Sequence, residues 1–469
     1  MRAAERPRIS RVVALAAITA AAVVGVASAA AAGSRATRWV ASSPVPANAD
    51  HSNAALDAVA CPPTGSCVAV GTYHDTSGAG HALVVTGSAA KWTPRAVAVP
   101  AESTPNGNGL EAVACPQVGD CAAVGEYEDG SGVQRGLLEN EKSGRWSPLE
   151  AALPANAGSA PTPRLVSVSC SSSRACVAVG EYQDNNGVFH ALLLRKARGL
   201  WRDVKVPLPA DAQPNGTAEL GSVSCPPSGG CVAVGMFTPK RDGRNGLVLR
   251  DSRGIWHAST APLPAGARVV GGAMRSVSCP DAGRCTAVGS YSSGASELGL
   301  LLDERGAKWR PSRVAAPKGR GVSPSSVACT SPGSCVTVGT RYTPKGAIVP
   351  LVVSEAAGHW GSAINVPLPR DWTNGSLVNT VACRSNGACV AGGEYTAQSP
   401  TESARWRGLL ISDVGSRWRA VAAPLPTVDD VFGAPLASAA CSRRGGCVEV
   451  GTYQTGKGLS ALLERTLPW

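Results

Sequence analysis

The sequence predicts an all-β fold, an eight-bladed β-propeller whose ring is closed by a strand near the N-terminal end of the domain. A segment with two cysteines recurs about every 54 residues, which is a period typical of propellers and solenoids. Short alternating segments and glycine-rich turns surround each copy. A tryptophan ahead of the first copy matches the tryptophans that follow the other copies. A seven-bladed ring is the alternative.

The recurring segment has two cysteines separated by five residues, as in "CPPTGSCVAVGTY" from Cys61. Its eight copies contain all sixteen cysteines and all seven tyrosines, and Phe237 takes the aromatic position in the fourth copy. Paired strands bring Cβ atoms within disulfide range across a hairpin turn. Structural zinc sites use shorter spacings, and the six histidines follow no pattern. We therefore predict eight local disulfides: Cys61–Cys67, Cys115–Cys121, Cys170–Cys176, Cys225–Cys231, Cys279–Cys285, Cys329–Cys335, Cys383–Cys389 and Cys441–Cys447.

One repeat, residues 110–154, contains four strand-like segments. "LEAVAC" is short and built from small residues, which suits the crowded innermost strand of a blade. "CAAVGEY", "RGLLE" and "RWSPLEAALP" follow as the second, third and fourth strands. The tyrosine of the second strand is expected to fill the space between adjacent blades, with its hydroxyl at the wet rim.

The two ends of the domain are expected to complete one blade together. Trp39 precedes the first cysteine pair, and "ALLERTLPW" ends where an eighth fourth strand would begin. We expect residues 37–47 to pair with the strand that ends near Leu463, because this pairing removes an exposed sheet edge. The matching tryptophans of the other repeats are Trp92, Trp146, Trp201, Trp256, Trp309, Trp360 and Trp418.

Residues 1–31 have the features of a signal peptide, followed by a single propeller domain over residues 32–469. Four arginines among the first eleven residues precede an apolar run from Val12 to about Ala32, with small residues at its end. The alternative is an uncleaved anchor, because the run is nearly long enough to span a bilayer. Export would place the cysteines in an oxidising compartment, so we expect a secreted or cell-wall-associated protein.

The net charge of +11 restricts the class of partner only weakly. The basic residues are spread through loops rather than clustered with aromatic residues, so we predict no nucleic-acid partner. No segment after residue 32 is apolar enough to span a membrane, and we expect a monomer.

Repeats of the form S-V-S-C-x5-C-V-A-V-G resemble exported β-propeller proteins of high-GC Gram-positive bacteria. The resemblance covers nearly all of the chain after residue 31 and implies a fold and a location, but no activity. A more distant resemblance is to Asp-box (BNR, sialidase-like) propellers, whose turn reads S-x-D-x-G-x-x-W. Only "DVGSRW", from Asp413 to Trp418, keeps the Asp, Gly and Trp spacing, and no Phe-Arg-Ile-Pro sequence occurs, so sialidase chemistry is not implied.

No motif for a serine nucleophile, a nucleotide phosphate or a catalytic zinc occurs in the sequence. We therefore predict no metal and no cofactor. Acidic residues at the end of the second strand and in the turn after it offer acid–base groups for a glycosidase or lyase. Turn formation is the favoured interpretation, because Asp and Asn shortly before Gly stabilise tight turns. These residues are Asp75, Glu126, Glu128, Asp129, Glu181, Asp184 and Glu394.

Two tryptophans depart from the repeat pattern. Trp372 lies in "PRDWTNGS", ahead of the seventh copy, and Trp406 lies in the long loop "SPTESARWRG". Propeller topology places both on one face of one blade, with Arg370, Arg405 and Arg407 around them. Our hypothesis is a ligand platform for a sugar ring or a partner side chain. The alternative is that the pair packs together and holds the loop.

The sequence thus favours an exported, non-enzymatic binding or scaffold propeller. Its partner would be a cell-wall polymer, a glycan or a surface protein. The alternatives are a carbohydrate-active enzyme that uses the loop carboxylates, and a purely structural wall protein.

Overall fold

The computed structural model describes most of the chain after residue 36. The described residues are 37–63, 65–88, 91–241, 243–267, 271–294, 296–317, 319, 321–398, 405–413, 417–426, 431–442 and 446–467. The predicted leader, residues 1–31, lies outside the described residues.

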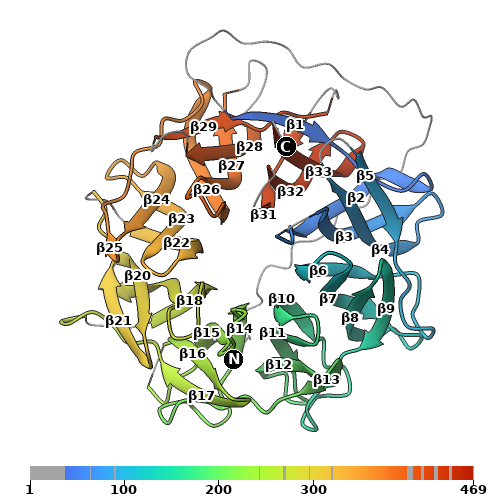
Figure 1. Ribbon diagram of the computed structural model, residues 1–469, viewed down its shortest axis with the longest axis horizontal. Helices are drawn as coiled ribbons and strands as arrows, with labels where there is room; N and C mark the ends of the chain where they lie inside the picture. The colour runs from blue at the N-terminus through green and yellow to red at the C-terminus, as the bar shows by residue number, and fades with distance from the viewer. Residues whose placement is uncertain are drawn as a thin grey trace, which may run out of the picture.

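The described residues form β-strands and no helix, and the sheets are arranged around a common centre like the blades of a propeller (Figure 1). Four sheets have four antiparallel strands each. They are β6 (Gly109–Gln117), β7 (Asp120–Glu128), β8 (Gln134–Lys142) and β9 (Arg145–Glu150); β10 (Arg164–Ser172), β11 (Ala175–Gln183), β12 (Phe189–Ala197) and β13 (Leu200–Asp203); β14 (Ala218–Ser224), β15 (Val232–Phe237), β16 (Asn245–Ser252) and β17 (Ile255–Thr260); and β26 (Trp372–Cys383), β27 (Cys389–Ala397), β28 (Arg405–Asp413) and β29 (Trp418–Ala422).

Two larger sheets each contain two antiparallel units joined by one parallel residue pair. Glu297 pairs with Gly321 in one sheet, and Asn53 pairs with Leu459 in the other. The first consists of β18 (Gly271–Ser278), β19 (Thr286–Ser293), β20 (Ser296–Arg305) and β21 (Lys308–Arg313), with β22 (Gly321–Ser331), β23 (Ser334–Tyr342), β24 (Ile348–Ala356) and β25 (His359–Trp360). The second consists of β2 (Ala49–Ala60), β3 (Cys67–Asp75), β4 (Gly80–Ser88) and β5 (Lys91–Ala96), with β30 (Val431–Gly433), β31 (Leu436–Cys441), β32 (Cys447–Thr455), β33 (Gly458–Leu467) and β1 (Arg38–Ser42).

Strand β1 is the outer strand of the last unit, although it comes first in the chain. It pairs antiparallel with β33, from Arg38 opposite Leu467 to Ser42 opposite Leu463, as the tryptophan pattern predicts. The buried Trp39 packs in the same apolar cluster as Leu410 of the preceding unit. Figure 1 shows β1 in blue beside the red C-terminal strands.

Each cysteine pair forms a disulfide within its own repeat, so all eight bridges have the pairing that the spacing predicts. In four of the repeats the two cysteines are directly opposite each other on neighbouring strands, as with Cys170 and Cys176. Each bridge closes a loop of only a few residues, for which the chain-entropy model gives about 2 kcal/mol of stabilisation. Eight bridges indicate an extracellular or otherwise oxidising environment.

The glycine of each "VAVG" segment is required by a bulge in the neighbouring first strand. A Cβ atom on Gly125 would overlap the carbonyl oxygen of Gly109, opposite the register shift between Leu110 and Ala112. The glycines at the same position of the other repeats have the same close approach, and they are Gly71, Gly180, Gly235, Gly289, Gly339, Gly393 and Gly451. Only glycine fits where two backbones approach this closely.

The "SVSC" sequence joins neighbouring units through side-chain hydrogen bonds. Ser222 Oγ accepts a hydrogen bond from the N–H of Val277 at 3.2 Å, and Ser224 Oγ accepts one from the N–H of Cys279 at 3.0 Å. The serines at the same positions of the neighbouring repeats make the same bonds: Ser167 to Val223, Ser169 to Cys225, Ser276 to Val327, and Ser278 to Cys329. These serines therefore satisfy backbone donors of the next first strand.

Replacing Ser224 by alanine is expected to destabilise the protein by about 1–3 kcal/mol, because the N–H of Cys279 loses its acceptor in a partly buried seam. The measurement is the midpoint of denaturant unfolding. Ser252→Ala is the control, since Ser252 is exposed at the end of β16 and should shift the midpoint little. Equal midpoints for both variants would contradict the proposed role of the serine.

Candidate functional site

Hydrogen bonds join different pairs of loops on the two faces of the molecule. On what we call the linker face, the turn between the second and third strands of a unit is hydrogen-bonded to the segment that precedes that unit. Examples are Thr104 N to Glu128 O at 2.8 Å, Gly158 N to Gln183 O at 2.9 Å, and Gln398 N to Asp371 O at 2.7 Å. On the opposite disulfide face, the tryptophan turns bond to the disulfide turns, as in Gly199 N to Arg174 O at 3.3 Å and Gly306 N to Gly283 O at 2.9 Å.

Three aspartates of the linker face act as turn-forming residues. Asp129 Oδ1 accepts hydrogen bonds from the N–H and hydroxyl of Ser131 and from the N–H of Val133. Its Oδ2 is 2.7 Å from Nε of Arg135. The hydrogen bonds from Ser131, followed by the one from Arg135, hold the pKa of Asp129 well below its usual range. This carboxylate therefore stays ionised and fully engaged.

The same arrangement recurs at Asp75 and Asp184. Asp75 Oδ2 lies 2.8 Å from Nε2 of His81, and Asp184 Oδ2 lies 3.0 Å from Nε2 of His190. Hydrogen bonds from Ser77 and then His81 lower the pKa of Asp75, and the hydrogen bond from His190 is the main cause of the lowered pKa of Asp184. The turn interpretation thus accounts for the contacts of these three residues.

The four candidate glutamates lie on three strands, β7, β11 and β27. Glu126 accepts a hydrogen bond from Nε2 of Gln134, and Glu128 accepts one from the hydroxyl of Thr104 at 3.0 Å. Glu181 is half-buried on β11, opposite Ala191 of β12. Burial raises the pKa of Glu394 on β27. None of the seven candidate carboxylates lines either of the two cavities described below.

Four of the tyrosine hydroxyls bond to the linkers, which the sequence interpretation did not anticipate. Tyr182 donates to Asn156 Oδ1 at 2.7 Å, and Tyr395 lies 3.1 Å from Asp371 Oδ1. Tyr73 and Tyr127 bond in the same way to Asn48 and Glu102. Burial, followed by the charge of Asp371, raises the pKa of Tyr395 to about 12, so its hydroxyl remains a donor. In each of these four linkers, the polar residue that bonds to the tyrosine stands two positions after a proline, and this pattern could have identified the contact from the sequence.

Trp372 and Trp406 both lie beside the linker-face end of β27. Trp372 pairs with Ala397, whereas Trp406 pairs with Thr396, the neighbouring residue on β27. Because side chains alternate along a strand, the two side chains start from opposite faces of the sheet. Both rings nevertheless approach Gly375, where a Cβ atom would lie 3.5 Å from the Trp406 ring. Both are half-buried. The indole N–H of Trp372 donates to the carbonyl of Gly375 at 3.0 Å, so its ring is fixed on the first strand.

The predicted arginines lie near these tryptophans, and Arg407 has a charged partner in the linker. Arg407 Nη1 lies 3.0 Å from Asp371 Oδ2, which also lies 3.2 Å from the hydroxyl of Tyr395. Arg405 is half-buried opposite Ala397, and Arg370 is exposed in the linker. Asp371 is the residue that organises this site, and the sequence analysis did not select it.

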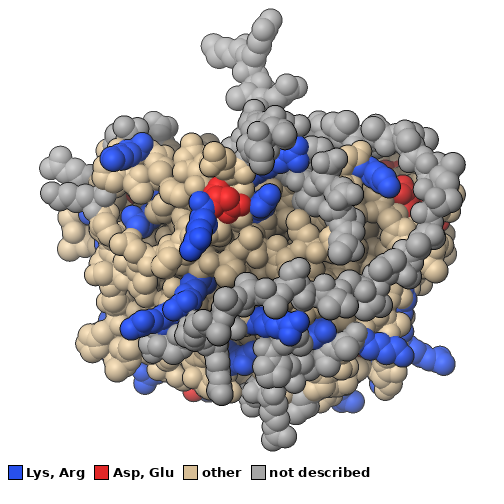
Figure 2. All heavy atoms as spheres, turned by 90° about the horizontal axis from the view of Figure 1, so that it is seen from above, with Lys and Arg blue, Asp and Glu red and all other residues tan. Residues whose placement is uncertain are grey.

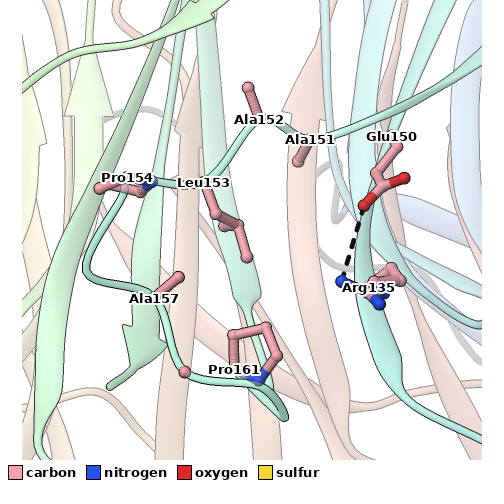
Figure 3. Close-up of a pocket in the computed structure, with 9 residues that line it drawn as sticks. Arg135, Glu150, Ala151, Ala152, Leu153, Pro154, Ala157 and Pro161 are labelled. Carbon is pink, nitrogen blue, oxygen red and sulfur yellow. Dashed lines mark ion pairs between the residues drawn. The ribbon is translucent and has the colours of Figure 1, made fainter. Parts of the chain in front are cut away.

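A cavity of about 460 Å³ opens on the linker face beside the β6–β9 sheet (Figure 3). Arg135 and Glu150 line one side, and the linker from Leu153 to Pro161 lines the other. The guanidinium of Arg135 is paired with Asp129 and lies 3.9 Å from Glu150 Oε1. Two carboxylates therefore neutralise the only cation in the lining, so the cavity is polar without being an anion site.

A second cavity of about 240 Å³ lies on the disulfide face, between the β18–β21 and β22–β25 units. Asp303 accepts hydrogen bonds from Trp360 and from Thr286, both at 3.0 Å. Glu355 is 7% exposed, and its Oε2 has no hydrogen-bond partner in the described residues. Burial, followed by the charge of Asp303, raises the pKa of Glu355 to about 7. This carboxyl group can exchange a proton near neutral pH.

Basic side chains are spread over the surface rather than gathered in one patch on the side seen in Figure 2. The part of the chain that the structure describes contains no group of three His, Cys, Asp or Glu side chains placed to hold a metal ion. Within the same residues, no helix has the length and apolar character needed to cross a membrane.

No protein-family model and no curated protein matches the chain. Among solved structures, it is similar to YCF48 bound to a D1 peptide, with 15% identity, a TM-score of 0.39 and coverage of 80% of this chain and 94% of that one. It is similar to a Trypanosoma rangeli sialidase at 11% identity and a TM-score of 0.36, covering 84% of this chain and 56% of that one. The fucose-specific lectin from Aleuria aurantia has 12% identity and a TM-score of 0.34, with coverage of 68% and 96%. These values do not transfer an activity to this chain.

Proposed function

We propose that the protein is an exported eight-bladed propeller that binds a cell-wall polymer, a glycan or a surface protein without catalysing a reaction. One contrast on the linker face carries the proposal. The turn aspartates are occupied by hydrogen bonds and ion pairs, whereas Trp372 and Trp406 keep part of their ring surface accessible to solvent. The surface is therefore better equipped to bind than to transfer protons.

A closed ring of eight blades would supply the rigid frame for this surface. Counting the two units of each larger sheet separately gives eight units, seven with four strands each and a last one that includes β1 and in which β30 and β31 both pair with β32. The N–H of Val59 in the first unit donates to Ser438 Oγ in the last at 3.2 Å, which is the contact found between consecutive "SVSC" strands. Val450 and Leu463 of the last unit also share an apolar cluster with Leu56 of the first. These contacts support closure between the two ends of the chain.

The two tryptophans would bind at the two edges of one ligand rather than stack on each other. Trp372 packs with the cluster that includes Val338 of the preceding unit, so it lies on the side of the sheet facing that unit. Trp406 lies on the other side of the sheet. A chain-like ligand laid across the end of β27 would reach both indoles, and Arg405 and Arg407 would contact its polar groups.

Substituting both tryptophans with alanine is expected to abolish binding in a pull-down with cell-wall material and a glycan panel, because both edges of the contact are lost. Tyr342→Ala is the matched control, since Tyr342 is an exposed aromatic residue at the linker-face end of the neighbouring unit. Melting temperatures of all variants should stay within a few degrees. Early unfolding of the double variant, or unchanged binding, would remove these residues from the proposed site.

An enzymatic function predicts a different result in the same assay. Release of a soluble product from a glycan by the wild-type protein, lost in Glu126→Gln, Glu181→Gln or Glu355→Gln, would establish catalysis instead of binding. Glu355 belongs in this set because its carboxyl group titrates near neutral pH inside a cavity.

A further inference from the structure

The residue before each turn tryptophan is basic in six repeats and aliphatic in two adjacent ones. The basic residues are Arg38, Lys91, Arg145, Lys308, His359 and Arg417, and the aliphatic ones are Leu200 and Ile255. Leu200 is 64% exposed and Ile255 is 65% exposed, and no other large apolar side chain in the described residues is as accessible. Two aliphatic side chains therefore replace charges at corresponding positions on the outer rim, at β13 and β17 (Figure 1).

Tight turns hold both side chains outward. Arg198 and Gly199 have φ of 53° and 88°, and Arg253 and Gly254 have φ of 56° and 90°. Positive φ at both central residues is typical of the rigid two-residue turns that connect hairpin strands. Leu200 then pairs with Ala197 next to the turn, and the following Trp201 faces the interior, where Asn140 accepts its N–H at 3.0 Å. The exposed position is thus fixed by alternation along the strand.

Arginines surround the aliphatic pair. On the first hairpin, Arg202 and its cross-strand partner Arg195 lie on the same sheet face as Leu200. The guanidinium of Arg195 reaches the next hairpin, because a Cβ atom on Gly254 would overlap it. Arg198 and Arg253 are exposed in the two turns.

Little negative charge offsets these arginines. Residues 195–202 contain no acidic residue, and Asp251 is the only one in residues 250–257. Asp203, which follows Arg202, alternates onto the other face of the sheet from Leu200 and Arg202. Asp251 Oδ1 accepts the N–H of Gly254 at 2.6 Å, so its carboxylate is used within its own hairpin. We call Leu200, Ile255, Arg198, Arg202 and Arg253 the rim patch.

We propose that the rim patch docks the protein onto an anionic lipid surface. The aliphatic side chains enter the interface between headgroups and acyl chains, and the guanidinium groups bind headgroup phosphates. The shape favours lipid over a peptide or polysaccharide, because the hairpins line neither described cavity. Their rings are also engaged, since Trp201 donates to Asn140 with Lys196 over its ring, and Trp256 is buried. Protruding aliphatic side chains ringed by arginine fit a deformable apolar phase.

Binding of the full chain to phosphatidylglycerol-containing vesicles tests this proposal. Every variant carries the apolar N-terminal segment, so total vesicle binding does not report on the rim patch alone. The deciding measurement is therefore made at the two hairpins. Amide hydrogen exchange should slow at residues 197–202 and 252–257 on anionic vesicles, and not on phosphatidylcholine alone. Leu200→Ser with Ile255→Ser should lower the partition coefficient about ten-fold. Arg198→Gln with Arg253→Gln should lower it by about five-fold per charge, with a smaller effect at high salt.

Leu149→Ser with Val421→Ser is the matched control, since these residues are 46% and 42% exposed on other fourth strands. The control should bind as wild type does, and all variants should melt within a few degrees of it. Equal binding of the two serine double variants, or no protection of the hairpins on anionic vesicles, would overturn the proposal. Equal protection by soluble polyphosphate, with no effect of the serine substitutions, would show a polyanion site and would also overturn it.

Discussion

Removal of residues 37–47 lowers the melting temperature by at least several degrees and makes the protein prone to aggregation. The deletion takes away β1, the outer strand of the last unit, and exposes the edge of β33 from Leu463 to Leu467. It also removes the buried Trp39 from its cluster, and loss of a buried tryptophan side chain alone costs about 3–5 kcal/mol. Calorimetry and light scattering during heating measure the two effects.

Two point variants separate the strand from the side chain. Trp39→Ala keeps the backbone pairing and should account for most of the loss of stability, whereas Arg38→Ala changes an exposed residue of the same strand and should have little effect. A melting curve of the deletion variant that matches the wild type would mean that β1 does not stabilise the last unit.

The stability of the protein decreases as the pH rises from about 5 to 8, because carboxyl groups are buried between two units. Glu449 and Glu464 are fully buried and directly opposite each other on β32 and β33. Burial is the main cause that raises the pKa of each well above its ordinary value, and the charge of Glu464 raises that of Glu449 further. Glu139, on β8, is buried in the same way, and burial raises its pKa to about 8.

The sign of the effect follows from proton binding. Above an unfolded pKa near 4.5, these groups are deprotonated in the unfolded chain but still protonated in the folded one. The folded state therefore binds more protons, and the free energy of unfolding falls as the pH rises towards the folded pKa. The slope approaches about 1.4 kcal/mol per pH unit for each such group.

Glu449→Gln with Glu464→Gln should flatten this decline, which thermal melts at several pH values can measure. Two other ionisable groups lie in the seam between the last two units, where Glu449 and Glu464 are buried. Arg384 approaches Thr466 at 3.3 Å, and Glu394 lies on the same face of β27 as Gly392. Asp203→Asn, at an exposed carboxylate, is the control and should keep the wild-type slope. An unchanged slope in the double glutamine variant would show that the pair does not set the pH dependence.

The sequence by itself determined the features that depend on residues close together in the chain. The five-residue spacing between cysteines predicted the disulfides, because a hairpin places two such residues opposite each other. Asp and Asn shortly before Gly predicted the turns at Asp75, Asp129 and Asp184. The position of Trp39 predicted the pairing of β1 with β33 through the repeat pattern alone.

Only the tertiary structure decided the contacts between residues of different units. Trp372 and Trp406 pair with adjacent residues of β27, so their side chains start from opposite faces of the sheet, which the sequence did not indicate. The hydrogen bond from Tyr395 to Asp371 likewise required the path of the linker. Neither follows from spacing, because a shift of one residue in register reverses the face of every side chain.

The seam between β27 and β32 shows most clearly which contacts between units the sequence could not predict. Glu449 stands where six of the other repeats have alanine, and Gly392 stands where the other seven have valine. Each substitution alone is unexplained, but a Cβ atom on Gly392 would overlap the carboxyl group of Glu449, so the glycine makes room for the glutamate. The two residues are 57 positions apart, and only packing of one sheet on the next brings them together. Sequence periodicity specifies each unit, whereas side-chain volume and register specify how the units fit.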